Sequence, residues 1–236
     1  MPSLKLVIAL YEFVILLFSV SVHECAQGWM ASRLGDQTAR LEGRISLNPT
    51  RHIDLLGTLV YPALMVFGPL IGFGGGGIVL GWGKPTPIIT RNLRKITRDT
   101  NFIVLAGLAA NLLLAFVAFL LLILLVKVMP GAREALIGTL QGGIIMAQTS
   151  APQALVILGW LMIQVNLGLF FFNLLPIPPL DGSRFLRNVL PYNALNTFDN
   201  IARFAFIVIF IVGRIWVSLF LGPAMGVVVA ALAVFL

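Results

Sequence analysis

Long apolar stretches are the feature that most constrains this chain. Residues 6–22, 102–126, 155–175 and 201–221 are predominantly apolar. Each stretch is about as long as the ~20-residue helix that crosses the hydrocarbon core of a bilayer. Only 11% of the 236 residues are charged, whereas soluble domains carry about 25%. So few charges cannot cover a water-exposed surface, which excludes a soluble globular enzyme and a disordered chain. We therefore predict a polytopic membrane protein.

The basic residues of the chain are explained by membrane topology. The chain has 16 Lys and Arg against 9 Asp and Glu, a formal net charge of +7. These cations lie between the apolar stretches and form no contiguous arm, so we expect no nucleic-acid partner. Cytoplasmic loops carry an excess of Lys and Arg, which predicts that the basic loops 84–99 and 182–203 are both cytoplasmic. The apolar stretch near the N-terminus is not followed by a small-residue cleavage site, and we expect a retained membrane helix there.

The stretch 55–82 is also apolar but is repeatedly interrupted. Its glycines and prolines are Gly57, Pro62, Gly68, Pro69, Gly72 and the run 74–77. Proline removes a backbone donor and glycine costs about 1 kcal/mol at a helical site, so a re-entrant or irregular segment is predicted. The run 74–77 lacks the following Lys and Ser or Thr of a phosphate-binding loop, which we do not expect here.

These observations predict an all-α polytopic membrane protein with about four to five transmembrane helices plus the re-entrant Gly/Pro-rich segment. The first helix is expected over residues 4–34, a length of roughly 46 Å that exceeds the ~30 Å hydrocarbon core. The tail at 226–236 is too short to cross alone. No internal repeat is visible, so residues 1–236 are predicted to form a single integral membrane domain, with a core at 4–190 and C-terminal helices at 199–236.

Two groups of polar residues lie where apolar stretches end. One is His23-Glu24-Cys25-Ala26-Gln27, and the other extends from Asn173 to Asp181 and Gly182. Ionisable residues at membrane depth are costly and are therefore functional candidates. A His-Glu-x-x-His helix places two imidazoles on one face to bind zinc, and its Glu activates the metal-bound water. His23 and Glu24 fit this pattern. Taken alone, however, they are also compatible with a metal-free helix end, and Asp181 with the N-cap of a helix that begins near Ser183.

Topology provides a test of whether these two groups can meet. If the stretch 55–82 crossed the membrane fully, the loop 33–54 would lie outside, and His23 and Asp181 would end up on opposite sides. A re-entrant segment keeps that arginine-containing loop in the cytoplasm, as the charge rule favours. We therefore predict an outside N-terminus and a site near the cytoplasmic face.

The combined motifs resemble the site-2 proteases, a family of intramembrane zinc metalloproteases. The resemblance rests on blocks in the expected order: His23-Glu24-x-x-Gln27-Gly28, Gly43-Arg44-Ile45-Ser46-Leu47-Asn48-Pro49 with His52-Ile53-Asp54, Gly81-Trp82-Gly83-Lys84-Pro85, Ala106-Gly107 with Asn111, and Asn173 to Gly182. It implies a protease-like core with Zn²⁺ as cofactor. It further implies the site residues: His23 and Asp181 as zinc ligands, Gln27 at the remaining ligand position, Glu24 as general base, and Asn111 and Asn173 as active-site supports. Gly107 with Asn111 is also compatible with simple close helix packing.

Gln27 departs from the family pattern, which has a second zinc histidine at this position. A neutral amide oxygen is a poorer zinc ligand than imidazole. Cys25 points about 200° around the helix from His23 and is not a convenient substitute. His52 is the one remaining histidine, and a loop that brings it to the metal is an open alternative.

Three functions follow from this reading. The first is a zinc metalloendopeptidase that is itself a multi-pass protein of a prokaryotic inner membrane. It would cleave transmembrane segments of membrane proteins near the cytoplasmic face. Its partners would be a transmembrane protein substrate and the lipid bilayer. The second is an impaired pseudoprotease that binds such segments without cleaving them. The third is a transporter or channel, which rests on broken apolar segments and intramembrane charge but lacks an inverted repeat.

Overall fold

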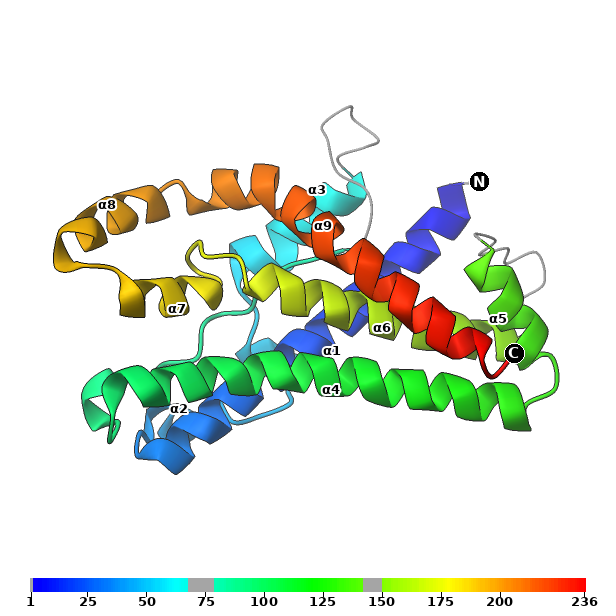
Figure 1. The fold of residues 1–236 in the computed structure, drawn as a ribbon, viewed down its shortest axis with the longest axis horizontal. Coiled ribbons are helices and arrows are strands. Elements are labelled where there is room, and N and C mark those ends of the chain that lie inside the picture. Colours follow the sequence, from blue (N-terminus) through cyan, green and yellow to red (C-terminus); the bar gives the residue numbers. More distant parts are fainter. Residues whose placement is uncertain (1, 68–78, 142–149) are drawn as a thin grey trace.

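Four long helices dominate the structure. The computed structural model describes residues 2–67, 79–141 and 150–236, and within these ranges it contains helices and no β-strand (Figure 1). The long helices are α1 (Pro2–Leu34), α4 (Ile96–Val128), α6 (Ala151–Asn173) and α9 (Ala205–Ala233). Each contains a window long and apolar enough to cross a membrane. The predicted all-α polytopic membrane fold is therefore confirmed.

Shorter elements connect the long helices. In chain order they are α2 (Thr38–Leu41), η1 (Pro49–Arg51), η2 (Leu55–Val60), α3 (Tyr61–Phe67), η4 (Thr90–Asn92), α5 (Ala132–Leu140), α7 (Gly182–Val189) and α8 (Tyr192–Ala202). Local side-chain bonds start two of them. The Asn48 carboxamide accepts from the Thr50 N–H before η1, and the Asp54 carboxylate accepts from the Gly57 N–H at the start of η2. Both are N-cap bonds that satisfy otherwise free backbone donors.

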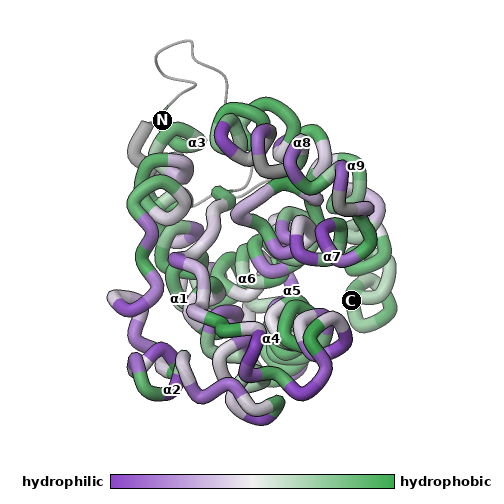
Figure 2. Tube along the Cα trace, turned by 90° about the vertical axis from the view of Figure 1, so that its left-hand side faces the viewer, coloured by the Kyte–Doolittle hydropathy of each residue, from purple (hydrophilic) through white to green (hydrophobic). Residues whose placement is uncertain are grey.

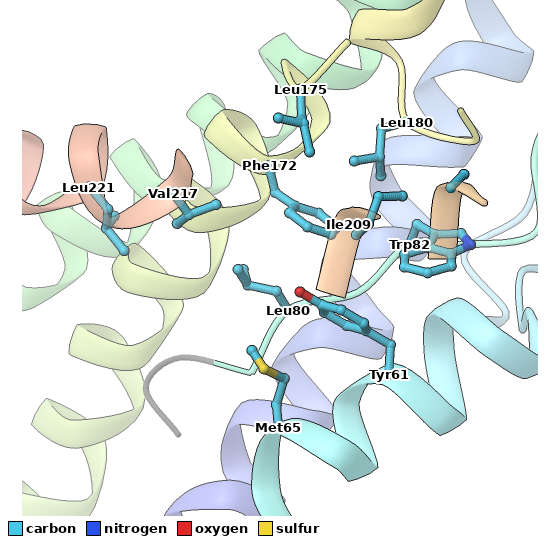
Figure 3. Packing of buried hydrophobic residues seen from close by; sticks show 11 residues of the cluster. Tyr61, Met65, Leu80, Trp82, Phe172, Leu175, Leu180, Ile209, Val217 and Leu221 are labelled. Atoms are coloured by element: carbon cyan, nitrogen blue, oxygen red, sulfur yellow. The ribbon is translucent and has the colours of Figure 1, made fainter. Parts of the chain in front are cut away.

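The centre of the molecule lies where α1, α4 and α6 pack against one another, with α9 alongside α6. Leu16 and Val20 of α1 are buried against Val165 and Leu169 of α6. A second cluster joins α3, α6 and α9 through Tyr61, Phe172 and Ile209 (Figure 3). The outward faces of the long helices stay apolar, as expected for surfaces in contact with lipid.

The described ends of the stretch 55–82 lie side by side. The Trp82 N–H donates to the Gly57 carbonyl at 3.2 Å, and the Thr58 hydroxyl donates to the Trp82 carbonyl at 3.0 Å. A Cβ on Gly57 would collide with the Trp82 indole, and one on Gly81 with the Gly57 carbonyl, so glycine permits this close approach. The chain thus returns to where the stretch began, as a re-entrant segment requires. The interrupting residues Gly68, Pro69, Gly72 and 74–77 lie outside the described residues.

The C-terminal region differs from the prediction of a span at 201–221 followed by a separate short tail. Helix α8 ends at Ala202, and α9 continues from Ala205 to Ala233 with Pro223 in its interior. Residues 226–233 of the predicted tail are therefore the last part of a 29-residue helix. Proline is tolerated inside membrane helices because neighbouring groups satisfy the freed backbone carbonyl, and the apolar sequence on both sides of Pro223 gives no signal to stop.

Candidate active site

His23, Gln27 and Asp181 meet in the interior of the molecule. His23 and Gln27 lie one turn apart on the same face of α1, and Asp181 precedes α7, 158 residues after His23. His23 Nε2 lies 2.8 Å from Asp181 Oδ2, and the Gln27 amide donates to the same oxygen at 2.7 Å. Gln27 Nε2 also lies 3.0 Å from His23 Nε2. All three side chains are buried, so the two groups of polar residues singled out in the sequence form one polar cluster in an apolar surrounding.

The path after α6 brings Asp181 to this cluster. A series of tight backbone turns follows the end of α6, with Ile177 N–H donating to Leu175 and Leu180 N–H to Ile177. Leu175 and Leu180 anchor these turns beside Phe172 (Figure 3). A Cβ on Gly182 would collide with the Leu174 carbonyl. Asp181 does occupy the N-cap position of α7, as expected, but its side chain makes no capping bond and points to His23 and Gln27 instead.

Arg184 fixes the orientation of the Gln27 amide. Its guanidinium donates to Gln27 Oε1 at 3.3 Å and lies 3.9 Å from Asp181 Oδ1. With Oε1 held by Arg184, the NH₂ group of Gln27 faces His23 and Asp181. An amide NH₂ donates hydrogen bonds and supplies no ligand for a metal. In this orientation Gln27 is therefore a donor to Asp181.

Helix α4 approaches the cluster from a second side. Asn111 is fully buried, and its Nδ2 lies 3.1 Å from His23 Nδ1. One turn earlier, a Cβ on Gly107 would stand 2.6 Å from His23 Nε2 and 2.8 Å from Gln27 Nε2. Glycine at this position lets the α4 backbone lie directly against the ring. The two roles that we considered for Gly107 and Asn111, packing and contact with the site, thus coincide.

Glu24 lies beside the cluster but faces a different element. One residue along α1 turns its side chain about 100° from His23, toward the extended chain at 79–89. Glu24 Oε2 accepts from the Thr86 N–H at 2.8 Å and from the Thr86 hydroxyl at 2.6 Å. Both residues are buried. Thr86 therefore holds one carboxylate oxygen of Glu24 and leaves Oε1 outside this pair of bonds.

The motif blocks between 43 and 54 hold the segment that carries Thr86. Arg44 donates to the Lys84 carbonyl at 2.5 Å, and the Lys84 N–H donates to the His52 carbonyl at 2.8 Å. The His52 ring itself lies against the Ser46 carbonyl, with Nε2 at 2.8 Å, and burial lowers the pKa of this imidazole below its ordinary value. His52 is thus built into the loop scaffold, and its described contacts do not bring it to His23 or Asp181.

The predicted residues fall into two groups by position. His23, Gln27 and Asp181 contact one another, Asn111 contacts His23, and Glu24 is adjacent on α1. Asn173 is buried at the end of α6, where its amide donates to the Leu169 carbonyl of its own helix, so its supporting role stays a prediction. Two contact residues had no signal in the sequence. Thr86 is a single hydroxyl in a polar loop, and Arg184 is one of several basic residues after Asp181.

The donor set decides how well zinc would fit here. His23 Nε2 and Asp181 Oδ2 are a nitrogen and an oxygen of the type that zinc prefers. Within the described part of the chain, no group of three or more His, Cys, Asp or Glu side chains is placed to hold a metal. Two protein ligands therefore fit zinc directly. A third is available through Gln27 Oε1 only if the amide rotates away from Arg184.

A helical membrane fold in which His23 meets the distant Asp181, with Glu24 beside them, has the arrangement expected of a membrane metalloprotease. Residues 11–213 match the profile of peptidase family M50, and the chain belongs to this family. The predicted membership in the site-2 proteases is thereby confirmed.

Two curated relatives carry the same assignment in their names. The chain is 33% identical over 198 residues to "Putative zinc metalloprotease YwhC" of Bacillus subtilis, which covers 84% of this chain and 77% of that protein. It is 30% identical over 166 residues to "Putative zinc metalloprotease Rip2" of Mycolicibacterium smegmatis, covering 70% of this chain and 52% of that protein. The chain thus spans about half the length of the second relative. No solved structure matches the chain significantly.

Proposed function

We propose that this chain is an intramembrane zinc endopeptidase of a prokaryotic inner membrane that cleaves transmembrane segments of membrane proteins near the cytoplasmic face. The observation that carries the proposal is the contact between His23 and Asp181 beside Glu24, across 158 residues of sequence. Three residue types that zinc peptidases use are gathered at one buried place, and the family and its relatives' names agree with that chemistry.

The ligands in this proposal are His23 Nε2 and Asp181 Oδ2, with Gln27 Oε1 as a weak third. When bound, zinc would polarise the scissile carbonyl and lower the pKa of a coordinated water. Thr86 holds Glu24 Oε2, so Oε1 is the atom that accepts the proton from the attacking water and later passes it to the leaving amine. With Nε2 as the ligand atom, the His23 ring carries its proton on Nδ1. Asn111 Nδ2 faces Nδ1, and Oδ1 has no partner among the described residues, so Asn111 would hold the ring after an amide flip, with Oδ1 accepting from Nδ1–H. The packed helices around the cluster limit access of bulk water.

A second candidate is a protein that binds transmembrane segments without cleaving them. One specific observation favours it. The Gln27 NH₂ group, held by Arg184, bonds to Asp181 and occupies that carboxylate with a hydrogen bond. In this case the cluster is a metal-free hydrogen-bonded group that holds α1 to the segment before α7, and the fold retains only the site that binds a membrane helix.

Cleavage by the purified protein in liposomes, with fluorescent transmembrane peptides as substrates, tests the proposal. We expect Glu24→Gln to lower the cleavage rate by about 10²- to 10⁴-fold, the range for loss of a general base, while peptide binding is retained. His23→Ala serves as the ligand control and should also abolish cleavage. Peptide binding with no cleavage by the unmodified chain would support the second candidate, and cleavage that is unchanged in Glu24→Gln would refute the assigned base.

A further inference from the structure

A polar pocket lies at the end of α1, beyond the candidate active site. It has a volume of about 530 Å³. Its lining residues come from α1, from α2 and from the loop that follows α2: Trp29, Ser32, Arg33, Arg40 and Ile45. Hydrophilic residues gather along this part of the chain around α2 (Figure 2). None of the five lining residues belongs to the cluster around His23.

The length of α1 places this pocket at the depth of lipid headgroups. The apolar part of the helix begins at Val7. At 1.5 Å per residue, the ~30 Å hydrocarbon core takes about 20 residues and ends near residue 27. The headgroup layer adds roughly 5–7 Å on each side. Trp29 lies about 3 Å past the end of the core by this count, inside the headgroup layer, and the Cα of Arg33 lies about 9 Å past it, just beyond that layer. The Arg33 guanidinium lies over the Trp29 ring, so the pocket opens at the headgroup edge of the membrane.

The charges in the pocket are available to an anion. The Arg33 guanidinium stacks over the Trp29 ring, 5.2 Å from its centroid. Both Arg33 and Arg40 are exposed. Among the described residues, neither guanidinium forms an ion pair with a carboxylate. Two cations at one opening therefore lack the counter-charge that the protein gives Arg98 and Arg184.

An apolar flank accompanies these cations. Leu41, next to Arg40 on α2, is 85% exposed, and Trp29 is 47% exposed. Tryptophan is enriched at the membrane interface because one end of its ring is apolar and the other donates a hydrogen bond. A ligand that suits this place has an anionic head for the two guanidiniums and an apolar body for Leu41 and Trp29.

We propose that this pocket binds the phosphate of an anionic phospholipid from the adjacent leaflet. Guanidinium groups form paired hydrogen bonds with phosphate oxygens, and basic pockets beside membrane helices bind anionic headgroups. Arg33 and Arg40 hold the phosphate, and the acyl chains run along the exposed Leu41 and the apolar part of α1. This inference is independent of the proposed peptidase activity.

Native mass spectrometry of the purified full chain tests this site with phosphatidylglycerol as the probe and phosphatidylcholine as the neutral comparison. We expect the double variant Arg33→Gln/Arg40→Gln to retain phosphatidylglycerol about thirtyfold less well, from the ordinary contribution of two arginines near anionic lipid. The double variant Arg91→Gln/Arg94→Gln removes the same charge from another exposed loop and should retain the lipid as the unmodified chain does.

Three results would overturn the proposal. Equal loss in both double variants would mean that general surface charge, not the pocket, attracts the lipid. Equal retention of phosphatidylcholine would mean that the headgroup charge is not recognised. Displacement of phosphatidylglycerol by inorganic phosphate at the same concentration would assign the pocket to a free anion. Circular dichroism of each variant confirms that the helices are intact, so a loss of lipid is not a loss of fold.

Discussion

The two halves of the candidate active site are built differently. Around Glu24, two bonds from Thr86 hold one carboxylate oxygen, and the residues that position Thr86 are those of the family's own motif blocks. Around His23 and Asp181, the residue one turn from His23 is an amide, and Arg184 turns its NH₂ group toward the other two. Under the proposed roles, the half that would hold the general base has its contacts in place, whereas the half that would hold the metal has an amide at residue 27.

This difference teaches that the two halves are separable in the fold. Glu24 faces the extended segment 79–89, and His23 with Gln27 faces α4 and Asp181, so a change at residue 27 leaves the bonds of Glu24 untouched. A single substitution at the ligand position can therefore weaken metal binding while it preserves the rest of the site. Variants that act on one half and spare the other test this separation.

Among the residues that support either half, the largest effect is expected from Thr86→Val, which removes the hydroxyl and preserves the shape of the side chain. A hydrogen bond to a charged group is worth about 1.5–3 kcal/mol, so kcat for peptide cleavage should fall about tenfold to a hundredfold. Zinc content should not change. Thr86→Ser keeps the hydroxyl and should retain most of the rate. An equal loss in both variants would show that Thr86 acts through packing and not through Glu24.

A smaller effect is expected from Gly107→Ala, which attacks the ligand half alone. The new Cβ would stand 2.6 Å from His23 Nε2, and overpacking of this kind costs about 1–3 kcal/mol. We expect a lower midpoint of thermal unfolding and a displaced His23 ring. Gly138→Ala is the matched control, because a Cβ on that helical glycine of α5 meets nothing within 4 Å. A loss of stability as large at residue 138 would contradict the close contact assigned to Gly107.

The smallest effect is expected from Arg184→Gln. Loss of the guanidinium frees the Gln27 amide to rotate and removes a positive charge beside the metal position, so zinc affinity should rise by about tenfold. Equilibrium dialysis against a zinc buffer measures the change. Arg187→Gln removes the same charge from the same short helix and serves as the control. An unchanged affinity in Arg184→Gln would mean that this arginine does not restrain Gln27.

The sequence predicted the long helices and the meeting of His23 with Asp181, and it did so for physical reasons. Apolar runs of membrane length leave few alternatives to helix. The glycines and prolines of 55–82, together with the basic loops, indicated that His23 and Asp181 lie on the same side of the membrane. Contacts that depend on the path of irregular chain were beyond reach. Thr86 reaches Glu24 only because Arg44 and His52 hold the segment in place, and Arg184 reaches Gln27 only after the turns at 174–181. Helix α9 continues past Pro223 because a membrane helix tolerates an internal proline whose freed carbonyl is satisfied by neighbouring groups.

Zinc affinity of the unmodified chain and of Gln27→His, measured side by side with His23→Ala as the control, tests the central claim most directly. Even partners that only contact a ligand change metal affinity by about 10- to 100-fold, so restoring a direct imidazole ligand should tighten binding by on the order of a hundredfold or more. We expect weak binding at one zinc per chain in the unmodified protein, tight binding in Gln27→His, and none in His23→Ala. If neither the unmodified chain nor Gln27→His bound zinc, the assignment of His23 and Asp181 as the metal ligands would be contradicted.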